Sequence, residues 1–142
     1  MNDIYLIHYY YGDRLISFKT GLGTLIRAKG HLINVKAIII NNSFQWLKNF
    51  NQFREFNSII YNISQSEEIL SVLQNLIISL KNTVLLIVNF DLLIELGNIS
   101  LKDFIELIIK KQKSLEILLT GEIEYTELKE IADYVSFLQS FE

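Results

Sequence analysis

The chain of 142 residues contains no cysteine and no proline. Without cysteine it can form no disulfide, no thiolate nucleophile and no cysteine-ligated metal site. Basic residues do not outnumber acidic ones: 13 Lys and Arg stand against 16 Asp and Glu, for a net charge of −3. Because nucleic acids and anionic membranes are bound chiefly by clustered Lys and Arg, we expect neither as a main partner.

Long apolar runs are also absent. None approaches the roughly 18 residues that span a bilayer, and residues 1–5, Met-Asn-Asp-Ile-Tyr, lack the basic start of a secretory leader. We therefore expect a soluble, cytoplasmic protein without a membrane partner. What the sequence has in quantity is apolar side chains, 50% of all residues, which is enough for one domain spanning 1–142 with a substantial core.

Apolar, β-branched runs alternate along the chain with segments of helical periodicity. Strands are predicted over residues 4–11, 35–41, 58–63, 83–90, 115–119 and 134–137, and the run at 83–90 is apolar enough for a central strand. Helices are predicted from the Gly12-Asp13 turn to about Gly30, from a cap at 64–67 to about 81–82, from a Ser100 cap onward, and over 126–133. This alternation predicts an α/β fold with a mostly parallel sheet and helices on both faces.

The chain is organised around residues 9–30, where the first strand passes through Gly12-Asp13 into the first helix. A strand, a turn and a helix in this order form the phosphate-binding loop of many nucleotide-binding proteins. Such a loop needs small residues whose N–H groups point into one concavity, a Lys for the phosphates, and a Ser or Thr for Mg²⁺. Here residues 14–18 read Arg-Leu-Ile-Ser-Phe. The segment has the position of a phosphate loop without its chemistry.

Residues 11–30 resemble, without a gap, the ATP:corrinoid adenosyltransferases, whose corresponding stretch reads approximately T-G-(D/N)-G-K-G-K-T-T-A-A-x-G-x-x-x-R-A-x-G. The matching positions are Gly12, Asp13, Gly23, Arg27, Ala28 and Gly30. Residues 14–18 stand where the family has Gly-Lys-Gly-Lys-Thr. The residues of the frame match, and those that bind phosphate do not.

The resemblance continues in the second half of the chain. Residues 88–92, Val-Asn-Phe-Asp-Leu, line up with the family's Asp-Glu-(hydrophobic)-Asn-Tyr, so Val88-Asn89 replaces the Asp-Glu pair that would hold Mg²⁺. Residues 120–136 line up with its T-G-R…E-L…A-D-x-V-T/S ending, in which Glu122 stands at the position of the Arg.

The resemblance implies a P-loop NTPase-like fold, of the RecA-like or Rossmann-like kind. It also implies a reaction in which a cob(I) corrinoid attacks the 5′ carbon of the ribose of ATP and triphosphate leaves. ATP, Mg²⁺ and a corrinoid are implied by the family alone. Because the phosphate and metal residues are replaced, we expect a degenerate member, a pseudoenzyme for which no catalytic residue is assigned. The expected partners are a second copy of the chain in a homodimer, an active relative in a heteromer, or a corrinoid.

Five residues are candidates for a remnant of the phosphate loop: Gly12, Asp13, Arg14, Ser17 and Lys19. Arg14 could form a bidentate pair with a phosphate, whereas Lys19 lies about 200° around a helix from the usual Lys position. The alternative, which we favour, is an ordinary turn in which Asp13 caps the helix. Ile16 is β-branched and unsuited to the positive φ of loop glycines, so we do not expect the usual anion-binding concavity. Leu15, Ile16 and Phe18 would instead fill the place of the phosphates.

Other candidate residues have plainer interpretations. His8 and His31 lack metal-like spacing and are interpreted as core or surface histidines. The segment 43–56 could line a site for a flat macrocycle or face a partner, but we interpret its aromatic residues as core; they are Phe44, Trp46, Phe50, Phe53 and Phe56. Acidic residues near the last helix are interpreted as its solvated face and first turn; they are Glu122, Glu124, Glu127 and Glu130.

Three hypotheses about function remain. The first is an active corrinoid adenosyltransferase with a rebuilt phosphate site, and the second is a non-catalytic relative that acts as a binding or regulatory partner. The third is a repurposed domain that binds another ligand at the carboxyl ends of the strands. We favour the second, because every residue type expected to bind triphosphate and Mg²⁺ is replaced.

Overall fold

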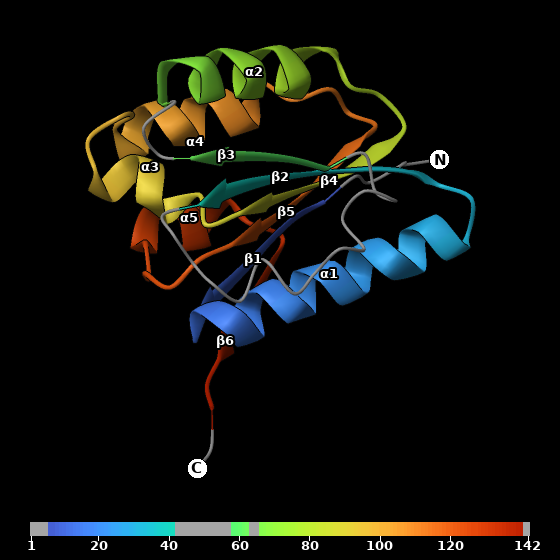
Figure 1. Cartoon of the computed structure of the whole chain (residues 1–142), viewed down its shortest axis with the longest axis horizontal. Coiled ribbons are helices and arrows are strands. Elements are labelled where there is room, and N and C mark those ends of the chain that lie inside the picture. Colours follow the sequence, from blue (N-terminus) through green and yellow to red (C-terminus); the bar gives the residue numbers. More distant parts are fainter. Residues whose placement is uncertain (1–5, 42–57, 63–65, 141–142) are drawn as a thin grey trace.

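The computed structural model describes residues 6–41, 58–62 and 66–140. Within these residues six strands form one sheet in the order β3-β2-β4-β5-β1-β6 (Figure 1), and every pair of neighbouring strands is parallel. The strands are β1 (Ile7–Gly12), β2 (Asn34–Asn41), β3 (Ser58–Asn62), β4 (Thr83–Val88), β5 (Leu115–Thr120) and β6 (Tyr134–Leu138). The predicted α/β fold with a parallel sheet is confirmed.

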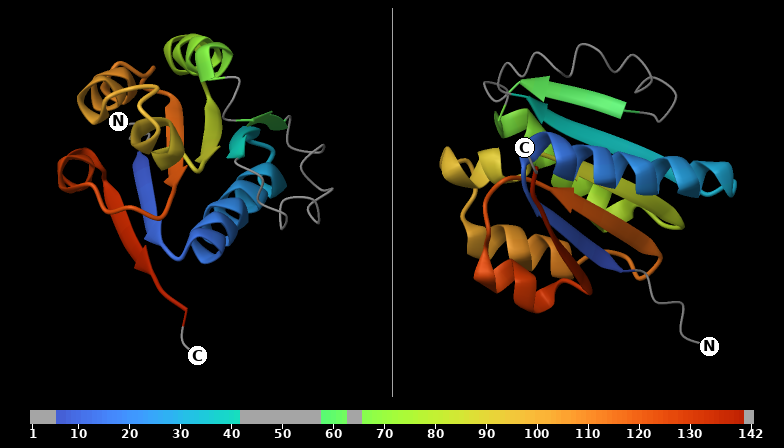
Figure 2. Two further views of the ribbon diagram at one scale, coloured as in Figure 1. Left: turned by 60° about the vertical axis from the view of Figure 1, so that its left-hand side comes forward. Right: turned by 90° about the horizontal axis from the view of Figure 1, so that it is seen from below.

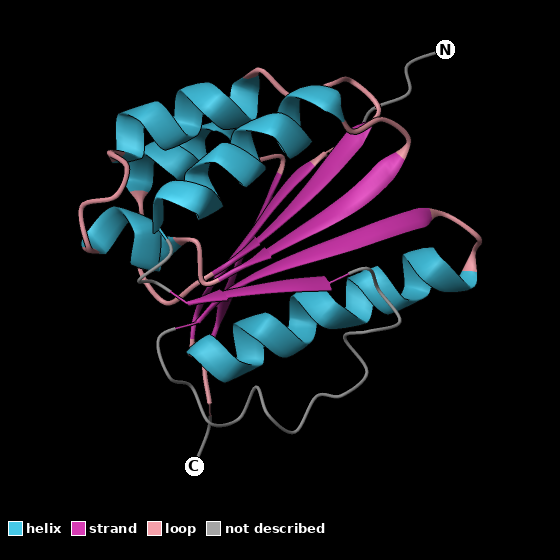
Figure 3. Cartoon of the chain, turned by 45° about the horizontal axis from the view of Figure 1, so that its top comes forward, coloured by secondary structure: helices cyan, strands magenta, loops and turns pink. Residues whose placement is uncertain are grey.

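Helices cover both faces of this sheet, as predicted. They are α1 (Arg14–Gly30), α2 (Ser66–Ser79), α3 (Asp91–Glu95), α4 (Leu101–Ile109) and α5 (Thr126–Ile131). Among the described helices, α1 lies alone on one face and the other four lie on the opposite face (Figures 2 and 3). None of the described helices has both the length and the apolar character that crossing a bilayer requires.

Two apolar clusters form the core, one on each face of the sheet. Alternate residues of one strand enter different clusters: Tyr9 packs beneath α2–α5, whereas Tyr10 packs with Phe18 and Leu22 of α1. All six residues of β4 are buried, which agrees with the predicted central strand. At the opposite extreme, β6 is an edge strand on which Tyr134, Val135 and Phe137 remain exposed.

Most element boundaries differ from the predictions by one to three residues, and two of these differences have a clear cause in the structure. The strand predicted to reach residue 90 ends at Val88, because Asn89 has a φ of +64° and turns the chain into the unpredicted five-residue α3. The helix predicted to reach residue 133 ends at Ile131, because Asp133 bonds to β1 instead. Its carboxylate accepts from Ile7 N–H at 2.8 Å and its N–H donates to Ile7 C=O at 2.9 Å. The aromatic segment 43–56 lies outside the described residues.

Candidate functional site

The turn between β1 and α1 is closed by backbone contacts. Gly12 has a φ of +119°, and a Cβ there would lie 2.1 Å from Leu138 O. Asp13 N–H donates to that same carbonyl at 2.7 Å. Asp13 Oδ1 accepts from Ile16 N–H and Asp13 C=O accepts from Ser17 N–H, both at 2.9 Å. The interpretation of Asp13 as a helix cap is therefore confirmed, and α1 begins at the very next residue.

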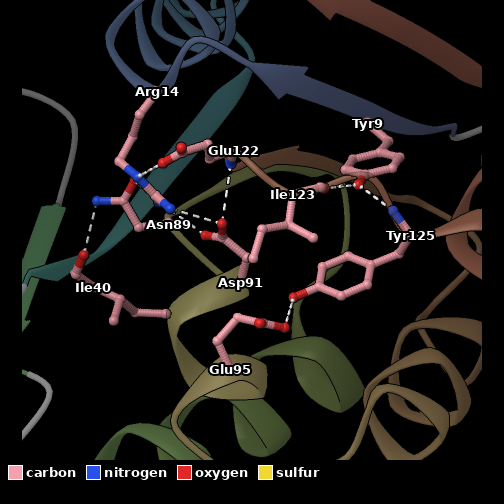
Figure 4. Close-up of polar contacts among 9 residues, drawn as sticks. All are labelled: Tyr9, Arg14, Ile40, Asn89, Asp91, Glu95, Glu122, Ile123 and Tyr125. Carbon is pink, nitrogen blue, oxygen red and sulfur yellow. Dashed lines mark hydrogen bonds and ion pairs between the residues drawn. The ribbon is translucent and has the colours of Figure 1, made fainter.

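Arg14, the first residue of α1, extends its side chain across the carboxyl ends of β4 and β5 (Figure 4). One terminal nitrogen, Nη1, donates to Asn89 Oδ1 and to Asp91 Oδ1, each at 2.9 Å. The other, Nη2, donates to Asp91 Oδ2 at 2.7 Å, and Nε lies 3.4 Å from Glu122 Oε2. We call Arg14, Asn89, Asp91 and Glu122 the Arg14 cluster.

The partners of Arg14 are themselves held by the ends of the strands. Asn89 directly follows β4, where its amide Nδ2 donates to Ile40 C=O in β2 at 2.9 Å and its N–H donates to Thr120 C=O in β5 at 2.8 Å. Asn tolerates the positive φ of this position better than most residues do. Asp91 Oδ2 also accepts from Glu122 N–H at 3.0 Å. The Arg14 cluster thus joins β1–α1, β2, β4–α3 and the end of β5.

Burial makes the Arg14–Asp91 pair the dominant charge interaction of the cluster. The Asp91 side chain is fully buried and that of Arg14 is 13% exposed, whereas Glu122 is 64% exposed. Burial by itself lowers the pKa of Arg14, but the hydrogen bond with Asp91 and the charge of Asp91 outweigh it, and the pKa is raised. Arg14 is therefore held as a cation, and its exposed contact with Glu122 adds little.

Comparison with known protein families assigns almost the whole chain to one family. The family model described as ATP:corrinoid adenosyltransferase BtuR/CobO/CobP matches residues 5–142. The chain belongs to this family. No curated protein matches the chain. Membership confirms the resemblance found in the sequence, and the parallel sheet with helices on both faces is consistent with the P-loop NTPase-like fold that the resemblance implied.

The charged residues of the Arg14 cluster stand at positions where the family pattern has an uncharged residue or one of opposite charge. Arg14 stands at a loop glycine of the adenosyltransferases, Glu122 stands at their Arg, and Asp91 stands at their Asn. The interpretation of Glu122 as a solvated residue is confirmed by its 64% exposure, and the structure adds a contact with Arg14 that sequence reasoning did not foresee. Sequence reasoning missed Asp91 altogether. Asp91 could have been recognised as a carboxylate that closely follows an apolar strand, because the end of another strand carries Arg14 where the family pattern has a glycine.

The other residues proposed as a phosphate-loop remnant are not brought together. Ser17 is buried, and its hydroxyl has no hydrogen-bond partner among the described residues. Lys19 is exposed on α1, which agrees with its predicted direction. Phe18 is fully buried in the cluster beneath α1, and Leu15 packs against the same cluster. Only Asp13 and Arg14 therefore place side chains at the turn itself.

A second polar chain fixes the loop that carries Glu122 (Figure 4). The Tyr9 hydroxyl donates to Ile123 C=O and accepts from Tyr125 N–H, the latter at 3.0 Å. The Tyr125 hydroxyl donates to Glu95 Oε2 at 2.8 Å. Burial raises the pKa of both tyrosines, so both stay protonated donors at neutral pH. Loop 121–125 is thereby tied to β1 and to α3.

The histidines agree with their plain interpretation. His8 lies in β1, where its Nε2 is 3.0 Å from Glu116 Oε1, and His31 is exposed after α1. Within the described ranges no group of three or more His, Cys, Asp or Glu side chains is placed to hold a metal ion.

Proposed function

We propose that this chain is a member of the ATP:corrinoid adenosyltransferase family that does not transfer adenosyl from ATP and acts instead as a binding or regulatory homologue. The observation that carries the proposal is the Arg14–Asp91 pair, which lies at the head of α1 and bridges the ends of β4 and β5. Family membership supports the corrinoid adenosyltransferase-like character of the domain.

The groups present do not suit triphosphate and Mg²⁺. A phosphate site at a helix start needs N–H groups that point at the anion, but those of Ile16 and Ser17 are taken by Asp13. A Mg²⁺ site needs carboxylate oxygens, but both oxygens of Asp91 are bound to Arg14 and Asn89 supplies only an amide. We derive no reaction step through either group.

The charge around the turn also opposes a polyanion. Asp13, Asp91 and Glu122 carry three negative charges close to the single positive charge of Arg14. A triphosphate would have to approach this excess of negative charge and then compete with a buried carboxylate for Arg14. We infer that the chain binds a corrinoid or an active relative of the family rather than ATP.

Calorimetry on the unmodified chain tests this function. We expect no saturable heat on titration with Mg-ATP, and adenosyl transfer to a reduced corrinoid no faster than without protein. Micromolar ATP binding or clear turnover would contradict the proposal, and repeating the titration with Arg14→Ala and Lys19→Ala would show whether either residue supplies a rebuilt phosphate site. A separate titration with a corrinoid distinguishes the remaining hypotheses. Corrinoid binding would favour a carrier or sensor, and the absence of corrinoid binding would favour a role that depends on a protein partner.

A further inference from the structure

Asp91, Asn89 and Glu122 present only hydrogen-bond acceptors to Arg14. These are both carboxylate oxygens of Asp91, the amide oxygen of Asn89 and one carboxylate oxygen of Glu122. The Asn89 amide cannot turn to offer its NH₂ group instead, because Nδ2 is bound to Ile40 C=O in the interior of the sheet. The ligand that such a set selects must be a donor and a cation.

The geometry of the set is more selective than its charge. Asp91 receives the two terminal nitrogens of Arg14 at 2.9 and 2.7 Å, which is the paired, fork-like contact of a planar guanidinium with a carboxylate. An ammonium group is a point charge and cannot make both contacts in one plane. A phosphate, which offers acceptors, would face other acceptors at every contact.

We propose that this place at the ends of β4 and β5 is a guanidinium-binding site, and that Arg14 is its tethered ligand. The site is preorganised without Arg14, because Asn89 is fixed by β2 and β5 and Asp91 by the Glu122 N–H. A buried carboxylate left without its cation is strongly unfavourable, so the site emptied of Arg14 takes up another guanidinium. This inference goes beyond the proposed function, because it rests on the geometry of the Arg14 cluster and not on the identity of a corrinoid or a protein partner.

The test is chemical rescue of Arg14→Ala. Ethylguanidinium reproduces the part of the arginine side chain beyond Cβ, and Ala retains the Cβ. We expect saturable binding of ethylguanidinium to Arg14→Ala and a saturable rise in its melting temperature, with neither effect in the unmodified chain. The double variant R14A/D91N should lose the binding. Arg27→Ala, which removes an exposed arginine from the other end of the same helix, is the matched control and should show no rescue.

Two further ligands test whether binding depends on the positive charge of the guanidinium. Ethylurea has the same shape without the charge and should not bind, and tripolyphosphate should not bind either. Equal effects of ethylurea, binding of tripolyphosphate in place of ethylguanidinium, or a folded variant that binds neither would each overturn the proposal. ATP is titrated into the unmodified chain and ethylguanidinium into the variant, so the two proposals can fail separately.

A measurement on the unmodified chain covers the case in which Arg14→Ala does not fold. We expect the Nη hydrogens of Arg14, followed by NMR, to exchange with water at least about tenfold more slowly than those of the exposed Arg27, because they are hydrogen-bonded to the buried carboxylate of Asp91. Asp91→Asn should remove much of this difference. Equal exchange at the two arginines would show that the site does not hold its guanidinium.

Discussion

Replacing Asp91 by Asn removes the buried charge opposite Arg14 while keeping the size and shape of the side chain. Asp91 is fully buried and Arg14 is only 13% exposed, so the substitution leaves a guanidinium in the interior without its main counter-charge. We expect a large loss of stability from a change that removes no volume, and therefore creates no cavity. The effect measures the electrostatic part of the Arg14 cluster.

The magnitude follows from the two sides of the pair. Removing one partner of a buried ion pair costs about 3–5 kcal/mol. We expect the lower end, about 3 kcal/mol, because Arg14 retains Asn89 and Glu122 as acceptors. With a urea m value of about 2 kcal/mol per molar, the midpoint of unfolding should fall by about 1.5 M.

Urea titration monitored by circular dichroism measures this shift. The control is Glu124→Gln, which breaks the exposed Glu124–Lys129 pair and should leave the midpoint unchanged. The double variant R14M/D91L, which removes both charges, should lose less stability than Asp91→Asn does alone, because no unpaired charge remains. A loss below about 1 kcal/mol in Asp91→Asn, or a double variant less stable than the single one, would refute the reasoning.

Two other predictions concern pH and glycine. Burial raises the pKa of Tyr9 above its ordinary value, so the folded state keeps a proton that the unfolded state loses above about pH 10. The contribution of Tyr9 to the free energy of unfolding is therefore fully present below that pH and is lost as the pH rises above it. In urea titrations from about pH 8 to about pH 11, Tyr9→Phe should make this loss of stability with rising pH shallower, and an unchanged loss in Tyr9→Phe would exclude the assignment. Gly23→Ala should raise the free energy of unfolding by up to about 1 kcal/mol, because nothing lies within 4 Å of the new Cβ in the helix. Gly121→Ala should lower it by about 1–3 kcal/mol, because the Cβ would lie 3.0 Å from Asp91 Cγ; the reverse order of these two variants would show that Asp91 is not tightly packed.

The secondary structure was largely predictable because its signals are local. The caps at Asp13 and Ser100 were recognisable from residue type, and both accept the expected backbone N–H. Apolar runs marked every described strand to within a few residues. The helix α3 was not predictable in the same way, because it has five residues and no side-chain cap. Its start depends on the backbone turn at Asn89.

The Arg14 cluster could not be predicted from local pattern, because its members come from three separate strand ends. Sequence reasoning recognised that Arg14 can form a bidentate contact, but assigned a phosphate as the partner. Asp91 took that role because the sheet order places β4 and β5 between β1 and β2, which periodicity alone does not determine. The compensation between a gained arginine and a gained carboxylate was visible in the sequence only as two separate departures from one family pattern.

The position of β1 in the sheet has a consequence for synthesis of the chain. Both neighbours of β1 come late: Ile7 pairs with Ile117 of β5, and His8 pairs with Tyr134 of β6. A ribosome therefore releases the apolar Tyr9-Tyr10-Tyr11 run long before any strand exists to cover its edges. The Asp13 turn must wait still longer, because its carbonyl partner belongs to Leu138. The first strand and the turn after it are therefore completed only by segments more than a hundred residues further along the chain, so the folding of this domain depends on contacts that are distant in the sequence.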